Sequence, residues 1–243
     1  MSVIDKIKKI KPAGDFCTAV IVAAGNSQRM GRDKILMPLL DAPVIAHTLK
    51  VFEDSEFVDE IIVVTRYESM QAIAELCGEF GITKIRRIVR GGRTRAESAL
   101  IGVCEADRKA TLIAIHDGAR PFPTDMLIER CVLAAKENLA AAPAVTATDT
   151  VRIVNKKGTV VSTPDRNLVA LIQTPQVFQA DLIKGALTKA VEKNTPVTDD
   201  CAAVEAMGYK VSIVAGEYDN IKLTTERDIY VAEKILSDRR ARK

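Results

Sequence analysis

The chain has 243 residues, of which 47% are hydrophobic and 28% are charged, and its formal net charge is +3. This length permits a sizeable core without disulfide or metal staples, and the small, mixed charge argues against nucleic acid as the main partner. Because no apolar run approaches the ~20 residues of a membrane span and no secretory signal begins the chain, we expect a cytoplasmic protein whose five scattered cysteines are small buried hydrophobes.

Residues 1–16 are interpreted as an N-terminal extension. Ile4, Ile7 and Ile10 recur three apart among lysines, which is the pattern of a short amphipathic helix. Docking against the rest of the chain, or fraying, is favoured over membrane binding. Residues 17–243 are predicted to form a single domain.

From Cys17 onward, short β-branched segments alternate with segments of helical period. The predicted strands are 18–22, 60–65, 84–89, 111–115 and 144–148, and the predicted helices are 44–52, 69–80, 95–105 and 126–138. This order predicts an α/β fold with a Rossmann-like, mostly parallel sheet and helices on both faces. Ligands of such sheets bind at the carboxyl ends of the strands, so the loops after Ala23, Val89 and Ile115 are the expected site.

Residues 149–173 break this rhythm and predict a projecting β-arm. Two β-rich stretches flank a Lys-Lys-Gly turn at 156–158, which is typical of a hairpin, and 166–173 can return to the main body. A projecting hairpin leaves strand edges and apolar side chains exposed unless something covers them. We interpret 149–173 as the arm of a homodimer, and the alternative is an edge hairpin folded onto its own domain. A strand at 211–215 and a closing helix at 225–236 complete the prediction.

A loop of mostly small residues, AAGNSQRMG at 23–31, follows the first predicted strand, and Lys34 lies just beyond it. Small residues let backbone N–H groups approach a phosphate closely, while Arg29 and Lys34 supply positive charge to its oxygens. The loop has the spacing of neither the G-x-G-x-x-G fingerprint nor the Walker P-loop. A dinucleotide-dependent oxidoreductase is therefore disfavoured.

Five further motifs follow in order: GGRTRAES at 91–98, IHDGARP at 115–121, TPQVF at 174–178, TDD at 198–200 and DNIKLT at 219–224. Over residues 18–236 the chain resembles the 2-C-methyl-D-erythritol 4-phosphate cytidylyltransferases of the non-mevalonate isoprenoid pathway. Three positions depart from the family pattern: Ser27 replaces a common glycine, Ile35 a common glutamine and Arg93 a frequent acidic residue. These departures concern loop shape and base contact, not the reaction class.

The resemblance implies that a phosphate oxygen of the acceptor attacks the α-phosphorus of CTP and that pyrophosphate leaves. A phosphomonoester has a second pKa near ~6 and is largely dianionic at pH 7, so the protein need not supply a nucleophile or a base. Catalysis then consists of aligning two anions and stabilising negative charge at the α-phosphate. The motifs supply the required cations: Arg29, Lys34, Arg120, Arg166 and Lys222.

The resemblance also assigns roles to individual residues. The implied catalytic residues are Arg29, Lys34 and Lys222. The implied nucleotide-binding residues are Ala23, Ala24, Gly25, Arg29, Lys34, Gly92 and Ser98. The implied acceptor-binding residues are Asp117, Arg120, Thr150, Arg166, Thr174, Thr198 and Lys222, with Thr150 and Arg166 reaching into the site of the partner copy.

A carboxylate among phosphates is repulsive unless it holds a divalent cation or pairs with an arginine. We therefore expect Asp117 to position Mg²⁺, together with Asp219, and a salt bridge to Arg120 is the alternative. His116 and His47 are expected to be packing residues.

Two other functions stay open. A cytidylyltransferase for another polyol phosphate, such as ribitol 5-phosphate, shares the scaffold, although the motifs at 115–121 and 198–200 favour methylerythritol phosphate. A non-catalytic nucleotide-binding protein that assembles through its arm is the other. The expected partners are CTP, a sugar-alcohol phosphate and a second copy of the chain, with no nucleic acid and no membrane. Cytosine and uracil are not distinguished by the sequence.

Overall fold

The computed structural model describes residues 14–25 and 34–241. The predicted amphipathic start of the chain lies outside the described residues, and so do Ser27 and Arg29 of the first loop.

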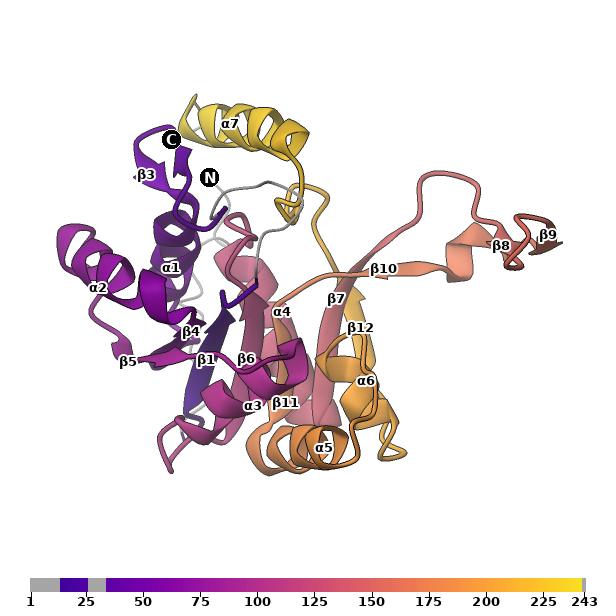
Figure 1. Ribbon diagram of the computed structural model, residues 1–243, viewed down its shortest axis with the longest axis horizontal. Helices are drawn as coiled ribbons and strands as arrows, with labels where there is room; N and C mark the ends of the chain where they lie inside the picture. Colours follow the sequence, from indigo (N-terminus) through magenta and orange to yellow (C-terminus); the bar gives the residue numbers. More distant parts are fainter. Residues whose placement is uncertain (1–13, 26–33, 242–243) are drawn as a thin grey trace, which may run out of the picture.

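A mostly parallel sheet forms the centre of the molecule (Figure 1). Its strands are β1 (Cys17–Val22), β4 (Glu60–Thr65), β5 (Ile85–Arg90), β6 (Leu112–Asp117), β7 (Ala140–Thr146), β10 (Ala170–Ile172), β11 (Gln176–Gln179) and β12 (Ser212–Ala215). Their order is β10-β7-β11-β6-β1-β4-β5, with β12 paired to β7. The pairs β1–β4, β1–β6, β4–β5 and β7–β12 are parallel, whereas β10 and β11 run antiparallel to their neighbours. The predicted fold class is confirmed.

Helices cover both faces of this sheet. On one face pack α1 (Val44–Asp54), α2 (Met70–Glu79) and α4 (Asp125–Asn138), and on the other α3 (Arg95–Cys104), α5 (Ala180–Glu192) and α6 (Asp200–Glu205). Successive strand side chains point to opposite faces, so Ala19 and Ile21 belong to the first core and Val20 to the second. The last helix, α7 (Glu226–Ala241), lies beyond the strand ends and packs on the small hairpin of β2 (Pro38–Leu39) and β3 (Ala42–Pro43).

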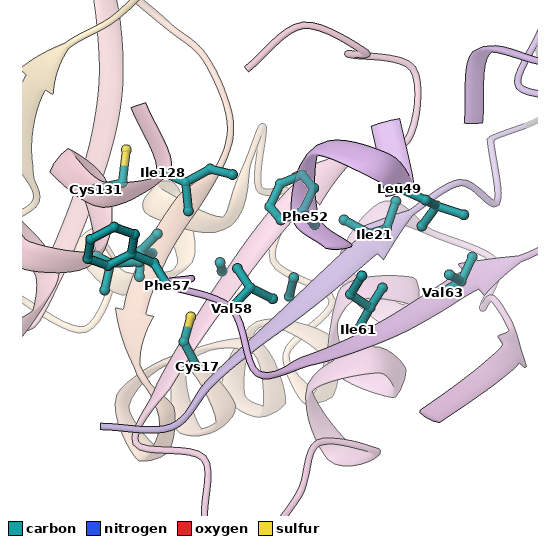
Figure 2. Packing of buried hydrophobic residues seen from close by; sticks show 14 of the residues in the cluster. Cys17, Ile21, Leu49, Phe52, Phe57, Val58, Ile61, Val63, Ile128 and Cys131 are labelled. Atoms are coloured by element: carbon teal, nitrogen blue, oxygen red, sulfur yellow. The ribbon is translucent and has the colours of Figure 1, made fainter. Parts of the chain in front are cut away.

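Figure 2 shows the first of these cores, where in this view Phe52 of α1 lies between Ile128 of α4 and Ile21 of β1. Cys17 and Cys131 are part of the same core, and burial raises the pKa of the Cys131 thiol to about 12. The expectation that all five cysteines are buried is wrong for Cys104, which is exposed. It follows Val103, which faces the sheet, and so lies on the solvent side of α3.

The predicted strands and helices are present with shifts of a few residues, but the region after α4 differs more. β7 begins at Ala140 and not at 144, because Leu139 adopts a left-handed conformation (φ 70°) that ends the helix and starts the strand at once. The alanines that follow have helical propensity, yet they are buried in the sheet between neighbouring strands. The strand β11 and the helices α5 and α6 were not predicted.

The arm at 149–173 projects from the sheet as predicted (Figure 1). Its hairpin consists of β8 (Ile153–Val154) and β9 (Val160–Ser162), joined by a turn in which Gly158 has a φ of +79°. The 3₁₀ helix η3 (Arg166–Leu168) follows, and β10 returns to pair with β7. The hairpin is not folded onto its own sheet, so that alternative is wrong. Among the described residues, no helix combines the length and apolar character needed to cross a membrane.

Candidate active site

A pocket of about 350 Å³ lies at the carboxyl ends of the parallel strands. Its lining consists of Val22, Ala23, Ala24, Gly25, Lys34, Ile35, Gly92, Arg93, Thr94, Arg95, Ser98, Asp117, Ala119 and Lys222. The tertiary structure thus brings together four separate motifs, which follow β1, β5 and β6 or precede α7. Of the predicted site residues, Ala23, Ala24, Gly25, Lys34, Gly92, Ser98, Asp117 and Lys222 line this one pocket.

Backbone hydrogen bonds hold the strand-end turns against one another. Ala23 N–H donates to Val64 O at 2.7 Å, and Gly91 N–H donates to Thr65 O at 2.8 Å. The turns approach so closely that a Cβ atom at Gly91 would lie 2.4 Å from the Cβ of Ala24. This glycine is required by packing against the first loop.

Ser98 has its hydroxyl proton committed within the protein. Its Oγ donates to Thr94 O at 2.9 Å and accepts from Gly92 N–H at 3.1 Å. A hydroxyl offers one donor and two acceptor positions, so one lone pair is left. Ser98, which is 3% exposed and lines the pocket, can therefore accept a hydrogen bond from a ligand in this arrangement but cannot donate one.

Asp117, the last residue of β6, lies among three cations. Its Oδ2 is 2.9 Å from Lys222 Nζ and 3.3 Å from Arg120 Nε, and its Oδ1 is 3.8 Å from Arg95 Nη2. Burial raises the pKa of Asp117, but Lys222, Arg95 and Arg120 outweigh it and hold the pKa well below its usual range. The carboxylate is therefore ionised and orients the cationic groups around the pocket.

His116 fixes the hydrogen-bond direction beside Asp117. Its Nε2 lies 2.9 Å from Arg120 O, a carbonyl that can only accept, so Nε2 carries the proton and Nδ1 accepts. The Thr174 hydroxyl therefore donates to Nδ1 at 3.0 Å while it accepts from Asp117 N–H at 3.1 Å. Burial lowers the pKa of His116 to about 4, although Asp117 and the Arg120 carbonyl oppose this shift. The prediction that His116 is a packing residue is confirmed.

The segment before α7 is tied to the same place. Arg120 Nη1 donates to Asn220 O at 2.8 Å, Leu223 N–H donates to Ala119 O at 2.9 Å, and Asn220 Nδ2 donates to Thr174 O at 2.9 Å. These bonds bring Lys222 to Asp117 although 105 residues separate them in the sequence. Arg120 and Thr174 thus adjoin the pocket through Asp117.

Arg95 is a pocket residue to which the sequence assigned no role. Its guanidinium makes two hydrogen bonds with Asp200, both at 2.8 Å, and Asp200 is fully buried. Burial lowers the pKa of Arg95, but Asp200 outweighs this and raises it. A signal was present: Arg95 begins a predicted helix, where a cation is unfavourable unless it has an anionic partner.

Other predicted site residues lie elsewhere. Thr198 is exposed and directly precedes Asp199, the N-cap of α6. Thr150 and Arg166 are on the arm, where Arg166 Nη1 donates to Thr148 O. Asp219 lines a different hollow, together with Tyr230 and Arg239. Arg29 is outside the described residues.

The expected magnesium site does not fit the residues that the structure describes. Both carboxylate oxygens of Asp117 face cations, and one of these is Arg120, which was the expected alternative to a metal ion. Asp219, the second expected metal ligand, lines a different hollow. Within residues 14–25 and 34–241, no three His, Cys, Asp or Glu side chains form a group suited to a metal ion. Of the described residues that line the pocket, Asp117 alone carries a carboxylate, which is too little for a cage built by the protein alone.

A larger hollow, of about 900 Å³, lies at the amino ends of the strands, where Glu60 and Ala110 are found. It is lined by four basic residues, Arg86, Arg87, Arg108 and Lys184, and four acidic residues, Glu60, Glu105, Asp107 and Asp181. Its charges therefore balance, and no predicted site residue lines it. The smaller pocket is the candidate site, because it lies at the carboxyl ends of the strands and is lined by the cations Lys34, Arg93, Arg95 and Lys222.

Comparison with known proteins agrees with this site. The family model for 2-C-methyl-D-erythritol 4-phosphate cytidylyltransferase matches residues 17–238. The protein of that name from Alkaliphilus oremlandii is 41% identical over 226 residues, which are 92% of this chain and 96% of that protein. The one from Caldanaerobacter subterraneus is 41% identical over 222 residues, 90% of this chain and 98% of its own.

Among solved structures, 4-diphosphocytidyl-2C-methyl-D-erythritol synthase from Anaerococcus prevotii matches with a TM-score of 0.84 and 34% identity, covering 92% of this chain and 97% of its own. The Thermus thermophilus cytidylyltransferase matches with a TM-score of 0.74 and 28% identity, covering 90% and 98%. The chain belongs to the 2-C-methyl-D-erythritol 4-phosphate cytidylyltransferase family.

Proposed function

We propose that this chain transfers the cytidylyl group of CTP to 2-C-methyl-D-erythritol 4-phosphate. A phosphate oxygen of the acceptor forms a bond to the α-phosphorus, the bond to the β-phosphate oxygen breaks, and pyrophosphate leaves with the electron pair. The products are 4-diphosphocytidyl-2-C-methyl-D-erythritol and pyrophosphate. Because the attacking phosphate is already dianionic, no protein group has to accept a proton.

The observation that carries the proposal is the pocket in which Ser98 and Lys222 lie together. Ser98 has only a lone pair to offer, which matches the 4-amino group of cytosine and not the 4-carbonyl oxygen of uracil. A site that must accept a hydrogen bond rejects a base that has an acceptor at that position. The geometry therefore favours CTP over UTP.

The phosphate end of the pocket is cationic. Lys34 and Lys222 line it, and Asp117 holds the Nζ of Lys222 at 2.9 Å. An ammonium held in place before the reaction stabilises charge that develops at the α-phosphate without reorganisation. We assign Lys34, Lys222 and Arg29 to this role, and Ala23, Ala24, Gly25 and Gly92 to the nucleotide.

For the acceptor we assign Asp117, Arg120, Thr174, Thr198 and Lys222. A divalent cation such as Mg²⁺ is proposed to enter with CTP, because Mg²⁺ at nucleotide sites takes much of its coordination from phosphate oxygens and water. We further propose that residues 17–243 act as one nucleotidyltransferase unit and that 1–16 is an extension.

We propose that the arm pairs two copies of the chain in the cytoplasm. The exposed apolar side chains Ile153, Val160, Val161 and Leu168 are 53%, 53%, 65% and 85% exposed. A lone two-stranded hairpin is marginally stable, so a cover for these residues is expected, and the same arm on a second copy supplies one. Thr150 and Arg166 would then contribute to the site of the partner, where the guanidinium of Arg166 can bind two phosphate oxygens.

The test is pyrophosphate release from CTP and Mg²⁺ with methylerythritol phosphate or ribitol 5-phosphate as acceptor, repeated with UTP. Release with methylerythritol phosphate and CTP is expected. Release only with ribitol 5-phosphate would support the proposed cytidylyl transfer but would show that the acceptor is ribitol 5-phosphate and not methylerythritol phosphate. CTP binding without release from either acceptor would favour the non-catalytic alternative.

A further inference from the structure

Arg95 connects two parts of the site. Its guanidinium holds Asp200 with two bonds of 2.8 Å, and Nη2 is also 3.8 Å from Asp117. The Asp200 side chain is 1% exposed and that of Arg95 is 29% exposed. A planar fork that holds a carboxylate through both nitrogens fixes distance and orientation together.

On the far side of this fork lies the turn that carries Thr198. Asp200 begins α6, and Gln176 Oε1 accepts from the N–H groups of Asp200 and Cys201 at 3.2 and 3.1 Å. Gln176 Nε2 also donates to Asp199 at 2.8 Å. The start of α6 is thus held from two sides, by Gln176 of β11 and by Arg95 of α3.

The hydrogen bonds of the turn at residues 92–94, which lines the nucleotide pocket, do not involve the Arg95 side chain. Thr94 caps α3 by accepting from Glu97 N–H, Arg93 N–H donates to Glu97, and Gly92 N–H donates to Ser98. Loss of the Arg95 side chain would leave all of these bonds in place. Loss of the Arg95–Asp200 ion pair would therefore disturb the positions of Thr198 and Asp117 more than those of Gly92 and Ser98.

We propose that Arg95 is a positioning residue for the acceptor: with Asp200 it holds the Thr198 turn and Asp117 against the nucleotide pocket. This inference rests on the proposed cytidylyl transfer, because it concerns the second substrate of that reaction. It extends the acceptor site to a pair that does not itself contact the acceptor.

The experiment compares Arg95→Gln, Asp200→Asn and the double variant with Arg130→Gln. Arg130 is the matched control, because it pairs with Glu217 at 3.0 Å and is 34% exposed but does not line the pocket. Steady-state kinetics gives the KM of each substrate and kcat, calorimetry gives the affinity for CTP, and thermal unfolding gives Tm.

Each single variant should raise the KM for methylerythritol phosphate about tenfold or more, because bonds to a charged group are lost. The affinity for CTP should change less than about threefold, since the turn at residues 92–94 keeps its hydrogen bonds to Glu97 and Ser98. The double variant should be no worse than the poorer single variant, because a single change leaves a buried charge unpaired. Arg130→Gln should lower Tm and leave the KM of both substrates unchanged.

CTP affinity that falls as much as acceptor affinity would overturn the proposal, since Arg95 would then be a nucleotide contact. An unchanged acceptor KM in folded variants, or fully additive effects of the two single changes, would overturn it as well. Failure of the proposed function has a different signature: the unaltered protein would release no pyrophosphate, and the acceptor inference would fall with it.

Discussion

At the scale of single residues, the site depends on where each proton resides. Ser98 and Thr174 both have a hydroxyl group near the pocket, and each donates a hydrogen bond within the protein. Ser98 donates to Thr94 O, and Thr174 donates to His116 Nδ1. Each hydroxyl therefore has only an acceptor position left for a further hydrogen bond. Each position can bind a group that donates a hydrogen bond, and it repels a group that can only accept one.

The first prediction concerns Ser98. Ser98→Ala should weaken CTP binding by up to about tenfold, the effect of one hydrogen bond, and should affect UTP less, so that discrimination between the two falls. Calorimetric titration with each nucleotide measures this. Ser237→Ala is the control, because Ser237 also bonds the carbonyl four residues before it, on α7 outside the pocket. Equal losses for CTP and UTP would refute the assigned polarity.

The second prediction concerns pH. The pKa of His116 is about 4 in the folded protein, because of burial, and about 6.5 when unfolded. Between these values the unfolded state binds more protons, so this contribution to stability is complete above pH 6.5 and is lost as the pH falls toward 4. At pH 4.5 the loss of unfolding free energy relative to pH 7 is about 2 kcal/mol.

Chemical denaturation of the parent and of His116→Gln at pH 7 and pH 4.5 tests this. The parent should lose more free energy of unfolding than the variant over this interval, by roughly 2 kcal/mol. Asp117 acts in the same direction, but its lowered pKa moves its contribution to more acidic pH. Parallel pH profiles for the two proteins would show that His116 is not the group responsible.

At the scale of elements, the site is a set of strand ends pressed together. Gly91 shows how close the contact is, because any side chain there meets both Ala24 and Ser98. The sequence predicted these loops correctly, since alternation of strands and helices fixes which ends of the strands share an edge.

The third prediction is that Gly91→Ala abolishes measurable CTP binding while the protein still folds. The added Cβ would lie 2.4 Å from Ala24 Cβ and 2.9 Å from Ser98 Oγ, so the first loop must move away. Calorimetry and thermal unfolding give the two readouts. Gly185→Ala on α5 is the control: nothing lies within 4 Å of its Cβ, and we expect unchanged binding with a gain of about 0.5–1 kcal/mol. Normal binding by Gly91→Ala would mean that the turn adapts.

Elements after α4 were harder to predict, for a physical reason. The stretch from Ala140 to Ala142 has the local preferences of a helix, and only its pairing with β11 and β12 makes it a strand. β11 is short and follows the arm directly, so the regular alternation of strand and helix is broken there. Local pattern is informative where each element is long and amphipathic, and it fails where burial by distant strands decides.

At the scale of the whole molecule, the arm is distinguished by its exposed apolar side chains, such as Leu168, which is 85% exposed. It projects away from the sheet (Figure 1), and its residue Arg166, a predicted acceptor ligand, donates to Thr148 O and does not line the pocket of its own chain. If two copies exchange arms, each site draws residues from both.

The fourth prediction follows from this exchange. Arg166→Ala and Lys34→Ala proteins should each be nearly inactive, and their mixture, after subunit exchange, should recover about a quarter of the parent activity. Half of the dimers would be mixed, and each mixed dimer would have one intact site of two. Activity assays before and after exchange, with size-exclusion chromatography, measure this. An unexchanged mixture is the control, and no recovery from mixed dimers would place Arg166 in the site of its own chain.

The sequence by itself determined the fold class, the edge of the sheet where the site lies, and the family motifs at Gly25, Ser98, Asp117 and Lys222. These follow from local periodicity and from short segments whose chemistry is contained within a few residues. Only the tertiary structure decided that Asp117 is enclosed by Lys222, Arg120 and Arg95, that Asp219 lies in another hollow, and that Arg95 holds Asp200. These contacts depend on which charged side chains are buried close to one another, where their interaction is strong. Residues up to 105 positions apart in the sequence, such as Arg95 and Asp200, meet only when the sheet has formed.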